Sequence, residues 1–478
     1  MNATRFIIVN MVVMTVAISC SKATIGTIDG PNERPSEQSF TVVVESVGEL
    51  FTGGEGVNPT MTTRRPISSV TPTQTFDKLS LIIVEYRSPA KVVYKTTIDN
   101  WSNPNNKASI PWSEEEGQGR YATIRLSGDE CLDEGMTYMA YAIGYQSGTY
   151  GDYEPFAGIE VGDNYNKTET ATVPTGGRPE EVFAGAEIFS VQHGKILSKR
   201  SEEAEFEHAL LLVRRQVAGT FGYFTRIPAK IQDVPVSCLR LVATHSNQTV
   251  IFGGFRGVDD SYDFHKDNVV NGMDPQTDFN ASLAGSTQLD AFTVYEIELA
   301  NWFPGNREDA RLPYDANGDG YLDAGDENWQ TDPEAYPAGT ISLSAGSVFG
   351  DKFVIPFAVT RDDVDFGRSS FQLQLLGVGG AILKHWNVTL RDLDAVENER
   401  RTLVSLPDGE TGRTQISELE NIDTESCFSI VRNRFYTMGE KSQSQNYGED
   451  MPVDLRVADN LVMDARHQWQ IQNSIIFN

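Results

Sequence analysis

The sequence predicts an all-β protein that consists of two β-sandwich halves in tandem. Many short segments alternate apolar and polar residues at period two, and 41 Gly and 21 Pro supply turn signals between them. No long stretch shows the 3.6-residue period of an amphipathic helix. With 478 residues, 39% of them hydrophobic and 10% aromatic, the chain is long enough for more than one domain and apolar enough to fill real cores.

Residues 1–19 have the features of an export signal. Arg5 is followed by the apolar run 6–18, which is too short to be a good transmembrane span. A small residue, Ser19, stands directly before Cys20, which is the lipobox arrangement of bacterial lipoproteins. We therefore expect cleavage before Cys20 and a diacylglycerol on its thiol, with palmitate as the fatty acid. An ordinary secretory signal that contains a Cys is the alternative. Residues 20–38 are polar and form a flexible tether.

The first half of the fold is predicted at 39–200, where the strands follow in order. Ser39–Val47 alternates apolar and polar residues, and the long loop Gly48–Thr75 follows it. Leu79–Tyr86 is a stronger apolar run and is predicted to be a central strand. Thr137–Tyr145 alternates again.

The second half is predicted at 201–478, because the polar stretch 198–207 separates two β-rich regions. It contains an alternating segment at Phe371–Leu375 and a large insertion around 257–350. Near the end, Arg466–Phe477 places most of its apolar residues on one face, as a half-buried strand does. This segment is either the last strand of its own sandwich or a strand that is donated to another molecule.

An acidic loop inside the insertion has the spacing of a calcium-binding loop. Side-chain oxygens fall at loop positions 1, 3, 5, 9 and 12, Gly320 stands at position 6, and the main-chain carbonyl of position 7 completes the set. We therefore predict a structural Ca²⁺ site that orders the insertion. Its last ligand is Asp where Glu is usual, and an acidic surface loop without a cation is the alternative. The predicted ligands are Asp315, Asn317, Asp319, Tyr321, Asp323 and Asp326.

The sequence contains no HExxH, GxSxG, Walker or GxGxxG motif, and its six His are scattered, so we expect no enzymatic activity. A net charge of −28 would repel phosphate backbones, so we expect no nucleic-acid partner. The remaining cysteines, Cys131, Cys238 and Cys427, are far apart and fit neither a disulfide framework nor a zinc site. We expect each of them to be a small buried hydrophobic residue.

A second reading of the function comes from the tryptophans. Trp302 and Trp329 flank the acidic loop and could stack on sugar rings. A surface carbohydrate-binding lipoprotein with a Ca²⁺-stabilised β-sandwich is therefore the alternative function. Packing of these residues in the core or in turns is the competing interpretation.

Several features taken together resemble the fimbrillin superfamily of Bacteroidales fimbriae. The lipobox and tether are followed by a short strand, an Arg-bearing loop and a strong strand. The mid-chain passages 181–185, 213–219 and 223–228 are similar to the segment where one fimbrillin domain ends and the next begins. Residues 432–436 are similar to an R-N-x-x-Y passage before the last strands. The insertion around 257–350 has no counterpart.

The resemblance implies two transthyretin-like β-sandwich domains and a fimbrial or adhesion subunit of the cell outer membrane. Its partners would be other fimbrial subunits, joined by strand exchange, and a host protein or glycan. It also implies that a trypsin-like protease cuts after an Arg in the first loop. Arg64 is the better candidate, since Arg65 precedes Pro66, and a solvated basic pair without processing is the alternative. Loss of Ser39–Val47 would remove Phe40, Val42 and Val44 from the core and open a slot for another strand.

Overall fold

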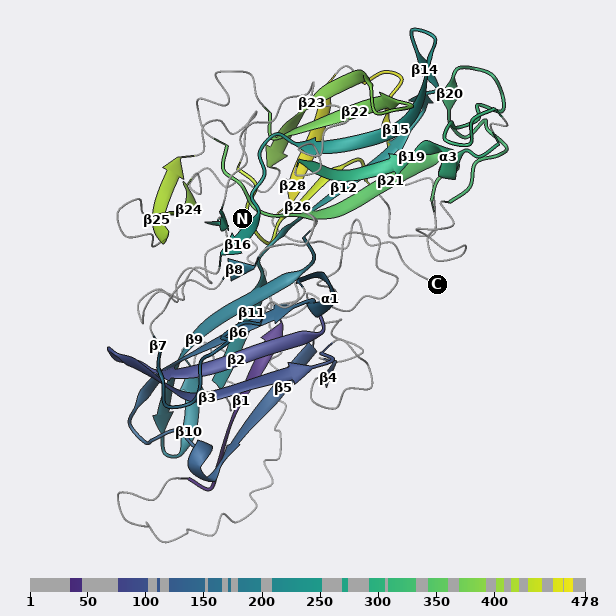
Figure 1. Ribbon diagram of the computed structural model, residues 1–478. Coiled ribbons are helices and arrows are strands. Elements are labelled where there is room, and N and C mark those ends of the chain that lie inside the picture. The colour runs from purple at the N-terminus through teal and green to yellow at the C-terminus, as the bar shows by residue number, and fades with distance from the viewer. Residues whose placement is uncertain are drawn as a thin grey trace, which may run out of the picture.

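The computed structural model describes eighteen stretches of the chain. These are residues 35–44, 76–101, 110–111, 120–150, 154–165, 171–172, 179–198, 209–251, 269–273, 292–305, 308–331, 343–359, 369–392, 401–407, 414–420, 429–440, 450–458 and 460–466. In these stretches the chain is nearly all β, and each of two large sheets curls around a core (Figure 1). No helix within them is long and apolar enough to cross a membrane.

The first sheet has ten strands and fills one lobe of the molecule (Figure 1). Its order is β4–β5–β1–β11–β9–β6–β2–β3–β7, with β10 paired to β9. The bounds are β1 Glu37–Val44, β2 Lys78–Glu85, β3 Ala90–Asp99, β4 Ile110–Pro111, β5 Arg120–Ser127, β6 Thr137–Tyr145, β7 Asn164–Tyr165, β9 Val182–Gln192, β10 Lys195–Ser198 and β11 Ala209–Arg215.

The second sheet also has ten strands and forms the other lobe. Its order is β14–β15–β22–β23–β28–β26–β12–β21, with β19 paired to β15 and β27 paired to β12. The bounds are β12 Ala218–Thr225, β14 Lys230–Ile231, β15 Val234–Ala243, β19 Thr293–Glu298, β21 Ser347–Val354, β22 Phe371–Gly377, β23 Ile382–Asp392, β26 Phe435–Met438, β27 Val453–Asp454 and β28 Leu461–Arg466.

Three small sheets accompany the two large ones in the described residues. The small sheets are β13–β20, β18–β16–β8 and β17–β24–β25, and the pairing of β16 with β8 joins the two lobes. The bounds are β8 Ala171–Thr172, β13 Ile227–Pro228, β16 Thr249–Ile251, β17 Val269–Val270, β18 Gly272–Met273, β20 Tyr321–Leu322, β24 Arg401–Pro407 and β25 Thr414–Glu420. The helical elements are η1 Gly128–Glu130, α1 Ser147–Tyr150 and α3 Leu299–Trp302.

Period-two alternation sends the side chains of the central strands to two different cores. In β2, Leu81 and Ile83 join the core of the first lobe, which also contains the apolar face of β1. Ile82 and Val84 point to the other side and belong to a larger cluster that also fills the second sheet. The central strands of the first sheet are therefore buried on both faces, which explains why β2 is a nearly continuous apolar run.

The two large sheets meet at a short, fully buried connection between β11 and β12. Gln216 accepts hydrogen bonds from Arg432 (3.0 Å) and Asn271 (3.1 Å), and its amide nitrogen donates to the carbonyl of Arg214 (2.8 Å). Beside it, Arg215 and Glu181 form a completely buried ion pair with an N–O distance of 2.5 Å. These contacts pair the buried amide of Gln216 and the two opposite charges that the connection buries.

The sequence located the main strands correctly. Thr137–Tyr145 is β6, and the predictions at Ser39–Val47, Leu79–Tyr86 and Phe371–Leu375 correspond to β1, β2 and β22. The predicted division between 200 and 201 lies ahead of β11, whose pairing with β1 and β9 places it in the first sheet. The chain changes sheets at Gln216 and Val217. The division into separately folding domains, and the transthyretin-like form of each, stay predictions.

Candidate functional site: the β1 slot and the acidic loop

Strand β1 is inserted between β5 and β11. It runs antiparallel to β5, where Glu37–Val43 face residues 127–121. It runs parallel to β11, where Phe40–Val44 face Ala209–Val213. An interior strand of this kind satisfies backbone groups on both neighbours, so its removal would expose two edges rather than one.

One face of β1 is buried along its length, and the other is buried at Val43. Phe40, Val42 and Val44 are fully buried in the core of the first lobe, and the Phe40 ring centroid lies 5.0 Å from that of Phe189. On the opposite face, Val43 packs with Leu210 and Leu212 of β11. Each large apolar side chain contributes roughly 1.5–3 kcal/mol on full burial, so an empty slot would strongly favour a replacement strand.

Polar contacts hold the beginning of β1. Gln38 is buried, and its amide makes two hydrogen bonds with the main chain of Leu132, which lies between η1 and β6. Glu37 forms an exposed ion pair with Arg125 of β5, with an N–O distance of 3.0 Å. An exposed pair of this kind contributes little, so the buried amide is the main polar contact at this end.

The predicted processing and lipidation residues lie outside the described residues. These are Cys20, Arg64 and Arg65. The two arginines belong to the segment between the end of β1 at Val44 and the start of β2 at Lys78. The covalent connection of β1 to the next strand therefore passes through the predicted cleavage site.

The candidate donor segment Arg466–Phe477 is described only at its first residue. That residue ends β28, which pairs parallel to β23 and antiparallel to β26. The described part of the terminal region thus belongs to the second sheet of its own chain. Residues 467–477 lie outside the described residues.

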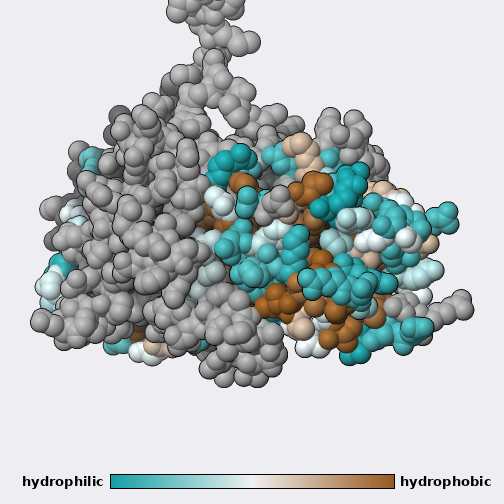
Figure 2. Space-filling model, turned by 90° about the horizontal axis from the view of Figure 1, so that it is seen from above, coloured by the Kyte–Doolittle hydropathy of each residue, from teal (hydrophilic) through white to brown (hydrophobic). Residues whose placement is uncertain are grey.

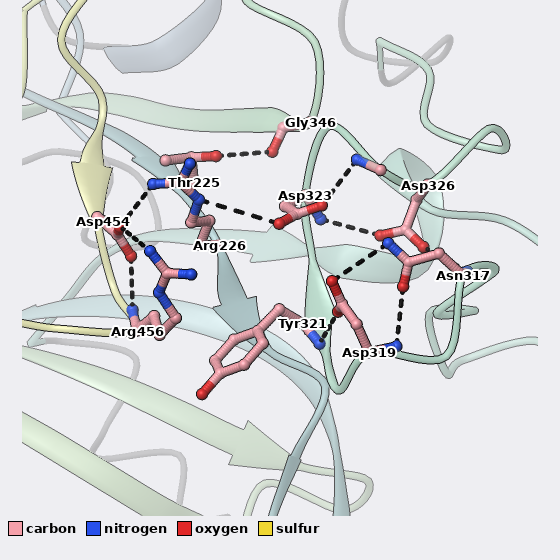
Figure 3. Close-up of polar contacts among 11 residues, drawn as sticks. Thr225, Arg226, Asn317, Asp319, Tyr321, Asp323, Asp326, Gly346, Asp454 and Arg456 are labelled. Carbon is pink, nitrogen blue, oxygen red and sulfur yellow. Dashed lines mark hydrogen bonds and ion pairs between the residues drawn. The ribbon is translucent and has the colours of Figure 1, made fainter.

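The acidic loop adopts a tight, internally bonded conformation. Asp315 accepts hydrogen bonds from the N–H groups of Gly318 (2.7 Å) and Gly320 (2.9 Å). These glycines have φ values of 72° and 93°, which L side chains rarely adopt. Asn317 and Asp319 each accept a hydrogen bond from the N–H two residues ahead. The loop therefore turns its side-chain oxygens back towards its own backbone, as Figure 3 shows.

Asp326 joins the two ends of this loop. Its carboxylate is buried and accepts hydrogen bonds from the N–H groups of Ala316, Asn317 and Asp323 at 2.7, 3.2 and 2.9 Å. Between these ends, Tyr321 and Leu322 form β20, which pairs with β13, and Leu322 is fully buried in the large core. The loop is thus attached to the second lobe by one buried apolar residue and by its short ladder with β13.

The structure brings the predicted calcium ligands onto one loop without a close carboxylate cluster. Within the stretches that the structure describes, no three His, Cys, Asp or Glu side chains are grouped so that they could hold a metal ion. In the predicted set, an amide from Asn317 and the main-chain carbonyl of Tyr321 complement the carboxylates. The residues have the chemistry that Ca²⁺ prefers, and the cation itself stays a prediction.

Cations of the protein lie next to the acidic loop. Arg226 is 4.0 Å from Asp323 and 2.8 Å from Asp454 of β27, which Arg456 also approaches at 3.3 Å. Partial burial raises the pKa of Asp454, but hydrogen bonds from Arg226 and Arg456 outweigh it and hold that pKa below its usual value. Arg226 therefore connects the loop with β27 near the end of the second sheet (Figure 3).

The tryptophans that the structure describes are buried or half-buried. Trp302 is 1% exposed and belongs to the core, where its ring packs edge-on against Phe349. Trp329 is half-buried, and its Nε1 donates to the carbonyl of Ser347 at 2.9 Å. Trp101 and Trp386 are also buried. On the face that Figure 2 shows, hydrophobic residues are interspersed with hydrophilic ones.

Two predicted buried cysteines are confirmed. Cys131 and Cys238 are both buried. Burial raises the pKa of the Cys238 thiol far above its usual value, which makes it a poor nucleophile at neutral pH. Cys427 lies outside the described residues.

Comparison with known proteins gives matches among solved structures only. No family model and no curated protein matches the chain. A candidate cell adhesion protein from Bacteroides eggerthii is 9% identical, with a TM-score of 0.36 over 92% of this chain and 98% of its own. One from Parabacteroides distasonis is 8% identical, with a TM-score of 0.34 over 90% and 96%. The fimbrial anchor protein Mfa2 from Porphyromonas gingivalis is 9% identical, with a TM-score of 0.28 over 83% and 99%.

These neighbours are candidate cell adhesion proteins and a fimbrial anchor protein of Bacteroidales, the group to which the sequence resemblance also points. Their TM-scores lie below 0.5. The proposals below therefore rest on the sequence and geometry of this chain.

Proposed function

We propose that this protein is a structural or adhesion subunit of a surface fimbria, exported as an outer-membrane lipoprotein and assembled by β-strand complementation. The observation that supports assembly is the position of β1. It is the first described strand, it lies between two neighbours, and a segment with two adjacent arginines connects it to β2. A cut after Arg64 or Arg65 would turn β1 into a separate, non-covalently held strand.

If β1 leaves the slot, a slot that is filled by another strand has a lower free energy than an empty one. An empty slot would leave unpaired N–H and C=O groups on β5 and β11 and expose an apolar channel to water. A strand from another subunit would restore the backbone ladders and the apolar contacts together. The segment 466–477 of a second copy is the proposed donor, because its alternation suits a half-buried strand.

Lipidation and processing can be tested on protein isolated from cells. Mass spectrometry of the amino terminus should find either a lipidated Cys20 or a new terminus directly after Arg64 or Arg65. Substituting both arginines by Gln should remove the new terminus and the SDS-resistant ladder of assembled subunits. Arg87→Gln, in an exposed turn after β2, is the matched control and should leave both unchanged. If the SDS-resistant ladder of subunits persists on the gel without any cleavage, assembly through the vacated slot is contradicted.

We also propose that the acidic loop binds Ca²⁺ and that the cation orders the insertion. The supporting observations are the ligand spacing, the left-handed glycines and the attachment of Leu322 to the core. Calorimetric titration should detect Ca²⁺ binding, and saturating Ca²⁺ should raise the melting temperature. Asp315→Ala with Asp319→Ala should abolish both effects. Asp129→Ala with Glu130→Ala, on exposed η1, should preserve them. Equal Ca²⁺ affinity in the two double variants would refute the site.

A further inference from the structure

The apolar pattern of β1 does not by itself define one register in the slot. Phe40, Val42 and Val44 stand at period two on the core face. A slip by one residue would turn this row to the wrong face, but a slip by two residues would keep it in the core. The ladders to β5 and β11 would also re-form after such a slip, because backbone groups repeat along the strand. Another contact must therefore set the register.

Gln38 makes that contact. It lies on the same face as Phe40, it is 3% exposed, and it precedes the apolar row. Its Nε2 donates to the carbonyl of Leu132 at 3.0 Å, and the N–H of Leu132 donates to its Oε1 at 2.7 Å. Leu132 is 2% exposed, so solvent hardly reaches this residue. Only a side chain that carries both a donor and an acceptor satisfies both main-chain groups.

The two hydrogen bonds form in one register only. A slip by two residues would move the amide by about 6.6 Å along the strand, at roughly 3.3 Å per residue, which is beyond hydrogen-bond reach. The N–H and C=O of Leu132 would then stay buried without partners, which is costly. Unlike the apolar row, this contact therefore distinguishes neighbouring registers.

We propose that the amide contact with Leu132 selects and aligns the strand that fills the β1 slot. A strand that makes the same contact must run antiparallel to β5 and carry Gln two residues before its aromatic anchor, as β1 does. Segment 466–477 has His467 two residues before Trp469, so as a donor it would fill the slot without this amide contact. This inference rests on the proposed strand exchange and adds a rule of specificity to it.

The test uses the full chain with a specific protease site placed between 48 and 75. After cleavage, residues 35–44 stay bound non-covalently and can be displaced by fluorescent peptides of the same sequence. The unmodified peptide should replace the fragment. Gln38→Ala and Gln38→Glu peptides should bind about tenfold more weakly or worse, because each leaves a Leu132 group unpaired or repelled. The matched control is a Ser36→Ala peptide, whose residue is exposed, and it should bind normally.

Register is read by cross-linking. Thr41 of β1 lies opposite Thr123 of β5, and Arg125 and Tyr121 lie two residues to either side of Thr123. A peptide with Thr41→Cys should form a disulfide with protein carrying Thr123→Cys and not with protein carrying Arg125→Cys or Tyr121→Cys. Adding Gln38→Ala to the peptide should spread the disulfide to one of the flanking positions.

The Glu peptide separates hydrogen bonding from shape. At acidic pH a protonated carboxyl has one donor and one acceptor, so binding of the Gln38→Glu peptide should recover while that of Gln38→Ala should not. Equal affinity of the Gln and Ala peptides, with cross-links at 123 alone, would overturn the register rule and leave strand exchange intact. Failure of the unmodified peptide to enter the slot would overturn both proposals.

Discussion

The ion pair between Glu181 and Arg215 lies beside the connection of the two sheets, and both side chains are 0% exposed. Removing one partner leaves the other charge buried without compensation. We expect Glu181→Gln to lower the free energy of unfolding by about 3–5 kcal/mol, measured by urea titration. Replacing both residues, Glu181→Leu with Arg215→Met, should restore much of this loss. The exposed pair of Glu37 and Arg125 is the control, and Arg125→Gln should have a far smaller effect.

Asp454 should make the stability of the folded protein depend on pH in the acidic range. Its pKa lies below the usual 3.8 in the folded protein, so its charged form stabilises the fold above that value. This contribution disappears as the pH falls through the lowered pKa. Wild type should therefore melt at a higher temperature than Asp454→Asn near neutral pH, and the difference should vanish well below pH 3.8. A difference that persists there would show that the carboxylate charge is not responsible.

At the scale of elements, Tyr295 packs the end strand β19 against the glycines of β12 and β21. Gly222 and Gly350 face each other across these strands, and a Cβ on Gly350 would lie 2.5 Å from the ring of Tyr295. We expect Gly350→Ala to cost about 1–3 kcal/mol of stability through overpacking, measured by chemical denaturation. Gly148→Ala has open space around its Cβ and serves as the control. If the two variants were equally stable, close packing at this point would be wrong.

The sequence predicted individual strands better than their partners. Period-two alternation of apolar residues indicates which side chains are buried. Because β1, β2 and β6 all bury such a row, the sequence predicted their ends to within a few residues. The polar stretch 198–207 indicated exposure, but exposure does not reveal that the following strand, β11, pairs with β1. The acidic loop could be predicted as a calcium site because its residues are adjacent in sequence, and the cation stays a prediction. Gln38 was missed, since its importance comes from Leu132, which is 94 residues away.

At the scale of the whole molecule, the two lobes share an apolar cluster and a polar junction. Residues from both large sheets belong to one core, and Gln216 is bonded to Arg432 and Asn271. We expect the wild type to unfold in a single calorimetric transition. Gln216→Leu leaves the groups bonded to Gln216 without that partner, so it should broaden or split this transition. Two separate transitions in the wild type would contradict a shared core.

The placement of β1 also has a mechanical consequence. A strand that lies between β5 and β11 is held by backbone hydrogen bonds on both sides. A pulling force along the strand axis would load all these hydrogen bonds at the same time, in shear, and would not break them one after another. A joint of that geometry yields only at high force, which would suit the contacts between subunits in the proposed fimbria.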